Sequence, residues 1–146
     1  MTDFKPKIAI SVGDLNGIGI EIAFKCHEKI SKICTPIYCI NNKMLKLAAK
    51  ELKTEIPNDF EIFKTKGEFE IKAGTVTKKA GKYSYDSFMD AINLAKNKEV
   101  DAICTLPINK EAWNKADIKY KGHTEVLRDF FVLYAIMMRG CKRMFV

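Results

Sequence analysis

The sequence predicts one α/β domain over residues 1–146, in which helices cover both faces of a mostly parallel sheet. Short apolar runs rich in β-branched residues alternate with segments whose apolar residues recur at helical spacing. A length of 146 residues suits one domain, and 47% hydrophobic residues are enough for a buried core. No internal repeat interrupts the alternation. These observations predict three layers, with the sheet between two layers of helices.

The first predicted strand, Lys7–Val12, runs into a glycine-rich turn, and a helical pattern then continues to about Ile33. A glycine-rich turn between a strand and a helix is a place where α/β folds bind phosphate groups. The spacing of Gly13, Gly17 and Gly19 matches neither the dinucleotide fingerprint nor a P-loop. Two interpretations therefore stay open: a phosphate cradle, or a turn that lets the helix pack closely on the strand.

The middle of the chain continues the alternation of strands and helices. Each strand is a short apolar run, and asparagine or serine residues stand where helices are expected to begin. The predicted elements are a strand over Thr35–Ile40, a helix over Met44–Leu52 capped by Asn41 or Asn42, a strand over Phe60–Phe63, a loop over Lys64–Lys82 with a strand or hairpin of its own, and a helix over Tyr83–Asn97 capped by Ser84 or Ser87.

A buried strand over Ala102–Thr105 then delivers polar residues to the end of the sheet. Pro107 stops the strand because proline cannot donate a hydrogen bond to the sheet. Asn109 is a good N-cap for a helix over Lys110–Ala116, on which Trp113 is expected to pack in the core.

A second junction of loop and helix follows within about twenty residues. Gly122 precedes His123, which is one of only two histidines in the chain. Thr124 stands at the start of a short helix, which is expected from Glu125 to about Phe131. The two junctions together predict a ligand site. Without further information, however, a histidine such as His123 more often has a structural role than a binding role. Two further strands are expected over Ala135–Met138 and Met144–Val146.

The formal net charge of +7 comes from lysines that are interleaved with acids along the chain. This pattern favours a solvated lysine-rich surface over a nucleic-acid interface, and it suits a small anionic ligand. No segment reaches the roughly 20 apolar residues that span a bilayer, and the N-terminus lacks the features of a signal peptide. We therefore expect a cytoplasmic protein without nucleic-acid or membrane partners.

The five cysteines form no CxxC pair. A zinc site made by Cys26 and His27 with Cys34 and Cys39 would have a spacing that matches no common ligand pattern. Buried reduced thiols are the favoured interpretation. His27 is expected to be structural.

Three segments, Ser11–Glu21, Thr105–Glu111 and Gly122–Glu125, together resemble the amino-terminal motifs of the 4-hydroxythreonine-4-phosphate dehydrogenases of pyridoxal phosphate (vitamin B6) biosynthesis. The resemblance extends from Lys7 to the end of the chain. The first motif departs from the family pattern, which usually has prolines at the positions of three residues here, Val12, Leu15 and Ile20.

The resemblance implies a three-layer fold similar to isocitrate and isopropylmalate dehydrogenases, with residues 1–146 forming the N-terminal part of a two-domain, homodimeric enzyme. It implies oxidation of 4-phosphohydroxy-L-threonine by NAD or NADP, with decarboxylation to 3-amino-2-oxopropyl phosphate. A divalent metal (Zn, Mg or Co) would be held by histidines beyond this chain. Most of the residues that bind the nicotinamide cofactor would also lie beyond it.

By the same resemblance, His123 and Thr124 bind the phosphorylated substrate. Lys110 would supply positive charge near an anionic group, and Asp14 would orient groups in the glycine-rich turn. Two alternatives stay open: a related dehydrogenase for another phosphorylated hydroxy acid, and a non-catalytic product that binds a phosphorylated ligand or only self-associates. The second alternative reflects the end of the chain inside a predicted strand, which suggests truncation.

Overall fold

The computed structural model describes residues 4–131, which form a four-stranded parallel sheet in the order β3-β2-β1-β4. The strands are β1 (Lys7–Ser11), β2 (Thr35–Cys39), β3 (Glu61–Phe63) and β4 (Ala102–Thr105). The predicted α/β class with a parallel sheet is confirmed. The strands predicted over 135–138 and 144–146, and Cys141, lie outside the described residues.

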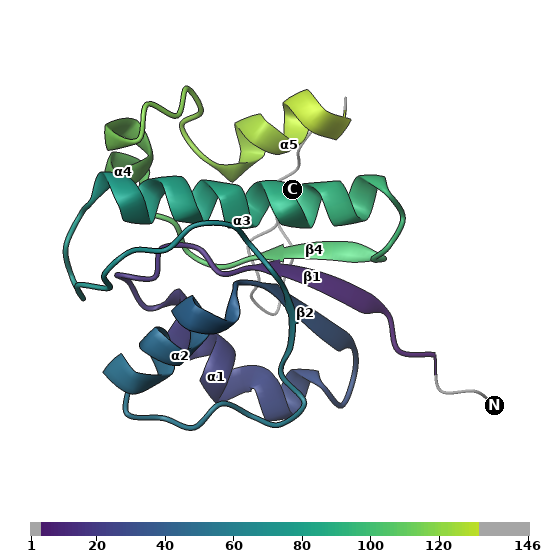
Figure 1. The fold of residues 1–146 in the computed structure, drawn as a ribbon. Coiled ribbons are helices and arrows are strands. Elements are labelled where there is room, and N and C mark those ends of the chain that lie inside the picture. The colour runs from purple at the N-terminus through teal and green to yellow at the C-terminus, as the bar shows by residue number, and fades with distance from the viewer. Residues whose placement is uncertain (1–3, 132–146) are drawn as a thin grey trace, which may run out of the picture.

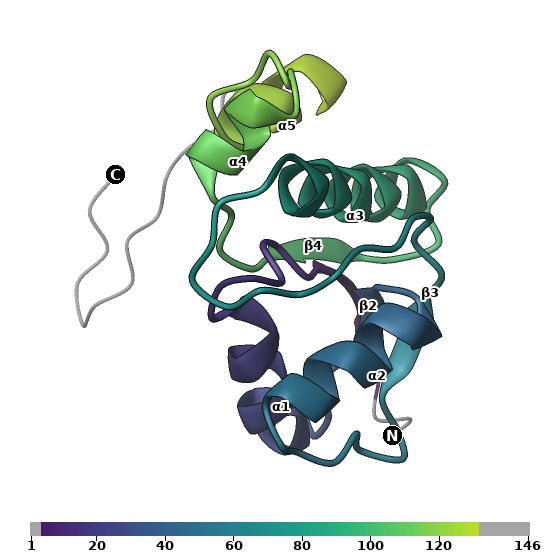
Figure 2. The same ribbon diagram turned by 60° about the vertical axis from the view of Figure 1, so that its left-hand side comes forward.

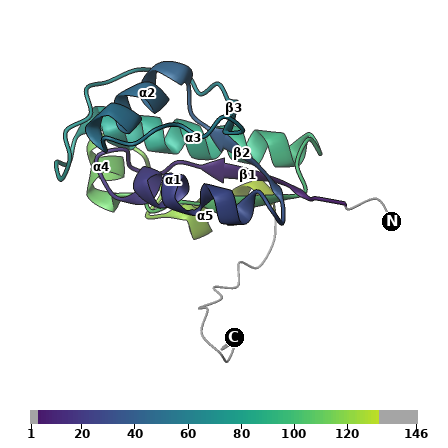
Figure 3. The same cartoon turned by 90° about the horizontal axis from the view of Figure 1, so that it is seen from below.

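Helices cover both faces of the sheet. Two of them, α1 (Gly19–Ile30) and α2 (Asn42–Glu51), lie on one face, and α3 (Lys78–Lys96) lies on the other (Figure 1, Figure 3). Two short helices, α4 (Lys110–Lys115) and α5 (His123–Phe131), pack on the outer side of α3 (Figure 2). The predicted three layers are therefore present, and α4 and α5 are added outside them.

The direction in which strands are added to the sheet reverses next to β1. From β1 the chain passes through α1 to β2, whereas β4 joins the opposite side of β1. In open α/β sheets, ligands bind at the carboxyl ends of the strands where such a reversal occurs. This topology directs attention to the loops that follow β1 and β4.

The core divides between the faces because side chains alternate along each strand. On one face, Ile10 and Tyr38 pack with apolar residues of α1 and α2. On the other face, Ala9 and Cys39 pack against α3. A third cluster joins α3 to the outer helices through Phe88, Ile92, Trp113 and Val126.

The predicted start of the third helix is wrong. The helix α3 begins at Lys78, ahead of the expected Tyr83, and its N-cap is Thr77, whose side chain accepts a hydrogen bond from the Ala80 amide. The serines that were expected to cap the helix are buried inside it. Ser87 Oγ donates to Cys39 O (2.7 Å) and accepts from the Val12 amide (3.0 Å), so it ties α3 to the sheet.

The strand or hairpin expected within 64–82 is also absent from this described segment, which runs as loop until Lys78. Side chains from other loops hold its backbone instead. Asn16 Oδ1 accepts from the Lys72 amide (2.9 Å), and Asn16 Nδ2 donates to Thr75 O (3.1 Å). These bonds satisfy backbone groups that a partner strand would otherwise engage.

Several other boundaries differ from the predictions by one to three residues. The first helix ends at Ile30 rather than near Ile33, and the last begins at His123 rather than Glu125. Among the helices of residues 4–131, none has the length and apolar character needed to cross a membrane.

The expectation of buried thiols is wrong for two cysteines, since Cys26 and Cys104 are exposed, whereas Cys39 is buried. Cys104 is exposed because no helix of residues 4–131 covers the α1 face of β4, the outermost strand on that side of β1. His27 is buried, with Nδ1 2.9 Å from the Tyr38 hydroxyl and Nε2 3.0 Å from Asp59 Oδ1. Within residues 4–131, no group of three or more His, Cys, Asp or Glu side chains is placed to hold a metal ion.

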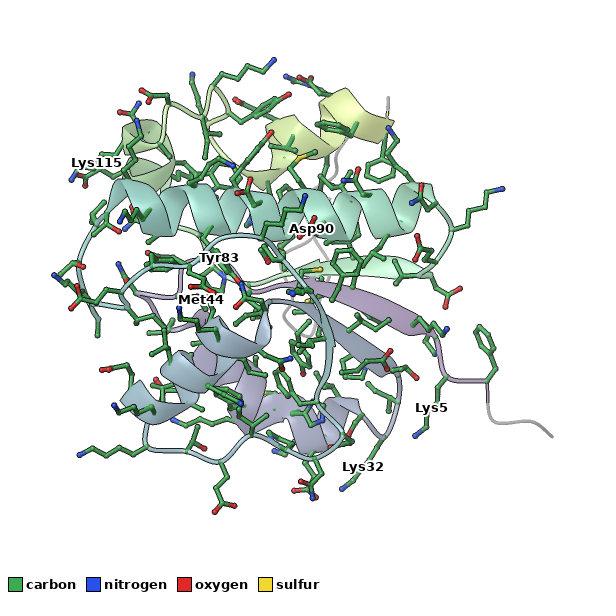
Figure 4. The ribbon with its side chains drawn as sticks, in the orientation of Figure 1. Lys5, Lys32, Met44, Tyr83, Asp90 and Lys115 are labelled. Atoms are coloured by element: carbon green, nitrogen blue, oxygen red, sulfur yellow. The ribbon has the colours of Figure 1, made fainter. Side chains whose placement is uncertain are left out.

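Asn41 is both the N-cap of α2 and a bridge to the loop after β3. Its Oδ1 accepts from the Met44 amide (2.9 Å), and its Nδ2 donates to Thr65 O and Gly67 O (both 2.8 Å). The Tyr83 hydroxyl accepts from the Asn41 amide, so α3 also reaches this point, close to Met44 (Figure 4).

We expect Asn41→Ala to lower the free energy of unfolding by about 2 kcal/mol, because a cap is lost and two carbonyl acceptors, one of them buried, lose their partner. Asn109→Ala is the matched control, since Asn109 caps α4 with one bond to the Ala112 amide. Its expected loss is about 1 kcal/mol. Denaturation of both variants measures the difference, and equal losses would contradict the bridging role.

Candidate functional site

The loops that follow β1 and β4 are joined directly. The Asp14 amide donates to Pro107 O (2.9 Å), and the Leu106 amide donates to Ser11 O (3.0 Å). Gly13 has a φ of +66°, and a Cβ atom at this position would lie 2.2 Å from Pro107 O. Only glycine meets both requirements, which explains the residue type at the start of the turn.

The glycine-rich turn packs closely against neighbouring backbone and side chains. A Cβ atom at Gly19 would lie 3.1 Å from both the Leu106 side chain and Val12 O. Gly13 and Gly19 therefore approach the loop after β4 and the end of β1 rather than open space. This geometry favours the packing interpretation over the phosphate cradle, and we assign no cofactor-binding residue here.

Asp14 is buried within the same turn, and its Oδ1 accepts a hydrogen bond from the Asn16 amide (3.0 Å). Burial raises the pKa of this carboxyl, and the bond from Asn16 opposes that effect. The carboxyl thus holds the turn in shape. It does not line the hollow described next.

The second junction forms an open hollow of about 300 Å³ beside the start of α5. It combines one apolar side chain with charged, hydroxyl and imidazole groups. The lining residues are Ile108, Lys110, Lys121, Gly122, His123, Thr124 and Glu125. The sequence motifs around Asn109 and Gly122 therefore meet in space, as the prediction of a ligand site required.

His123 is held between two aromatic rings of the third core cluster. Its ring centroid lies 4.7 Å from that of Phe88 and 5.8 Å from that of Trp113, with both rings nearly perpendicular to the imidazole. Nε2 is buried and has no hydrogen-bond partner among the described residues. Burial lowers the pKa of His123 from 6.5 to about 4, and the positive charge of Lys110 acts in the same direction.

Trp113 is itself fixed, as the sequence predicted, by packing in the core. The side chain is fully buried, and Nε1 donates to Ser84 Oγ at 2.7 Å. Ser84 Oγ in turn donates to Gly81 O (2.9 Å) on α3. This chain of bonds sets the wall against which His123 packs, and it is the role that Ser84 has in place of the predicted cap.

Thr124 lies in the first turn of α5, with its side chain exposed at the hollow. Glu125 Oε2 accepts from the Lys121 amide (2.9 Å) and so closes the loop that leads into the helix. Free amides of a first helical turn attract anions, and a threonine hydroxyl adds a further donor.

Lys110 is exposed at the first position of α4 and lines the same hollow. Its Cε lies 3.6 Å from where a Cβ atom would stand on Gly122, so the side chain passes over the loop before His123. The one acid of α4, Glu111, pairs with Lys115 instead (3.1 Å). The sequence did not assign Lys121 or Phe88 to the site, because neither residue type signals its position there.

The comparisons with known proteins agree with one another. The model of the family described as pyridoxal phosphate biosynthetic protein PdxA matches residues 32–146. A 4-hydroxythreonine-4-phosphate dehydrogenase of Sulfurimonas denitrificans is 58% identical over 97% of this chain and 46% of its own length. The corresponding protein of Campylobacter fetus is 56% identical with the same coverage.

A solved structure gives the same picture. The 4-hydroxythreonine-4-phosphate dehydrogenase of Burkholderia phymatum superposes with a TM-score of 0.81 and 27% identity, over 94% of this chain and 47% of that one. The chain therefore spans about half the length of the curated relatives and of the solved structure that it matches.

Proposed function

The chain belongs to the PdxA family of pyridoxal phosphate biosynthetic proteins, and from this membership we propose that it forms the N-terminal part of a 4-hydroxythreonine-4-phosphate dehydrogenase. The reaction proposed is the oxidation of 4-phosphohydroxy-L-threonine by NAD or NADP, with decarboxylation to 3-amino-2-oxopropyl phosphate. The identity of 58% over nearly the whole chain is the main support.

We propose that the described residues contribute a substrate site. They contain no group of three or more His, Cys, Asp or Glu side chains placed for a metal ion, and they show no dinucleotide fingerprint. The family resemblance implies that the divalent metal and most of the NAD or NADP are bound by the rest of the protein, and we derive no step through them.

His123 and Thr124 are the residues that we propose bind the substrate, with Lys110 beside an anionic group. The observation that carries this assignment is the imidazole of His123 at the edge of the hollow, with no hydrogen-bond partner for its buried Nε2 among the described residues. A buried polar atom without a partner calls for an explanation, and a ligand bound at this site would supply one. Lys110 and the amides of the first turn of α5 give the positive potential that a phosphate or carboxylate needs.

The architecture that we propose is a two-domain enzyme in which this chain is one domain. The active-site cleft would lie between the domains and be completed in a homodimer. Large apolar side chains such as Ile18 and Ile33, which are 62% and 71% exposed, are consistent with surfaces that a partner covers. On this basis, sedimentation velocity of the isolated 146-residue chain should show dimers or larger species.

The test is turnover by two proteins of different length. A protein that continues this chain to the length of its relatives should reduce NAD or NADP with 4-phosphohydroxy-L-threonine and a divalent metal, as absorbance of the reduced nicotinamide reports. The 146-residue chain alone should give no detectable turnover. Failure of the longer protein on this substrate would contradict the proposal, and turnover of another phosphorylated hydroxy acid would favour a related dehydrogenase.

A further inference from the structure

Aromatic packing holds the imidazole of His123 in place. Its buried Nε2 has no hydrogen-bond partner among residues 4–131. The rings of Phe88 and Trp113 pack against it, with centroids 4.7 Å and 5.8 Å from the centre of the imidazole. The position of the imidazole at the hollow therefore depends on the residues that fix these two rings.

Ser84 fixes the indole of Trp113. This side chain is fully buried, so its one polar group, the Nε1–H, requires an acceptor. Nε1 donates to Ser84 Oγ at 2.7 Å, and the Ser84 hydroxyl donates to Gly81 O at 2.9 Å. Because the hydroxyl hydrogen points to Gly81, a lone pair of the oxygen faces the indole. An indole rotated away from Ser84 would lose this bond, so Ser84 selects one orientation of Trp113.

One side of α3 carries the residues that hold His123. Gly81, Ser84 and Phe88 follow one another at spacings of three and four residues, which places them on the same face of a helix. The missing side chain of Gly81 lets the backbone of α4 come close at Ala112, and the next residue, Trp113, reaches Ser84. Phe88 contacts His123 one turn further along α3.

We propose that Ser84 is a positioning residue for His123 and that it acts through Trp113. The Ser84 hydroxyl sets the indole, and the indole with Phe88 sets the imidazole that meets a ligand. Ser84 does not line the hollow, so its effect on a ligand passes through Trp113. The effect on turnover rests on the proposed function, in which His123 binds the substrate.

Ser87 on the same helix offers a matched control. Like Ser84, it is buried and its hydroxyl makes two hydrogen bonds. Its partners are Cys39 O and the Val12 amide, on the side of the sheet rather than of α4. Ser87→Ala should therefore destabilise the fold as Ser84→Ala does, while Trp113 and His123 keep their contacts.

The ring signals of His123 in NMR spectra test the inference directly. His27 and His123 are the only histidines, so carbon–proton spectra of the histidine-labelled chain contain two sets of ring signals, and His123→Gln assigns them. Ser84→Ala should shift the His123 signals, because the ring currents of Phe88 and Trp113 act on it according to their positions. Ser87→Ala should leave them unchanged. An unchanged His123 signal in Ser84→Ala, or an equal shift in Ser87→Ala, would overturn the inference.

Trp113→Phe tests the path from Ser84 to His123. Phenylalanine keeps an aromatic ring but has no N–H group. If Ser84 acts through the indole bond, Ser84→Ala should shift the His123 signals much less when Trp113→Phe is already present. Equal shifts with and without Trp113→Phe would refute this path. The comparison of Ser84→Ala with Ser87→Ala decides the question by itself if Trp113→Phe does not fold.

The longer protein provides the functional test. With 4-phosphohydroxy-L-threonine as the probe, Ser84→Ala should lower kcat/KM about tenfold, whereas Ser87→Ala should change it little while the protein stays folded. An unchanged kcat/KM in Ser84→Ala would refute the positioning role. The NMR result does not depend on turnover, so a failure of this inference is distinguishable from a failure of the proposed dehydrogenase activity.

Discussion

Replacing Gly81 by alanine should lower the free energy of unfolding by about 3 kcal/mol. Gly81 lies inside α3 where α4 crosses it, and a Cβ atom there would stand 2.0 Å from Ala112 O and 2.3 Å from Ala112 C. The clash is with backbone, so no side-chain rotation relieves it, and the two helices must move apart.

The predicted loss of stability in Gly81→Ala is opposite in sign to what helix propensity predicts. In an exposed helix, alanine is more stable than glycine by roughly 1 kcal/mol, so helix propensity alone predicts a gain. Asn93→Ala is a suitable control, because Asn93 is exposed on the same helix and its replacement should be neutral or slightly stabilising. Denaturant unfolding of both variants decides the question, and a more stable Gly81→Ala protein would show that α3 and α4 do not pack this closely.

Replacing His123 by alanine in the longer protein should lower kcat/KM about a hundredfold, because a group that positions the substrate is lost. The fold should tolerate the change, since His123 is only partly buried. The measurement is the initial rate of NAD or NADP reduction together with a melting curve. An unchanged kcat/KM would remove His123 from the site.

Two amide variants identify which nitrogen matters. The side-chain oxygen of asparagine stands close to the position of Nδ1, whereas the longer glutamine places its amide near Nε2. If Nδ1 accepts the bond from the ligand, His123→Asn should retain more activity than His123→Gln. The reverse order would indicate that the ligand binds at Nε2.

Much of the fold follows from local patterns in the sequence. The β-branched runs at Lys7–Val12 and Ala102–Thr105 become neighbouring parallel strands, and Asn41 and Asn109 cap the helices that they were expected to cap. These features depend on hydrogen bonds and periodicity within a few residues of the chain, and a sequence displays such information directly.

The errors share a different cause. Helix α3 extends back to Lys78 because Ala80 and Gly81 are buried, and Gly81 packs against Ala112, on an element far along the chain. Ser84 looked like a helix cap, yet it accepts a bond from Trp113. In each case the residue that determines the local structure or the hydrogen bond is distant in sequence, so no local pattern predicts it.

The sequence by itself determined that this chain forms a parallel α/β domain. Its motifs also indicated the polar groups at the two junctions of loop and helix, near Asn109 and Gly122. Only the tertiary structure decided what these groups do. It showed that Gly13 packs against Pro107 and that Phe88 and Trp113 surround His123. The physical reason is that backbone preference is local, whereas burial, and with it the low pKa of His123, is created by residues that meet only when the layers pack.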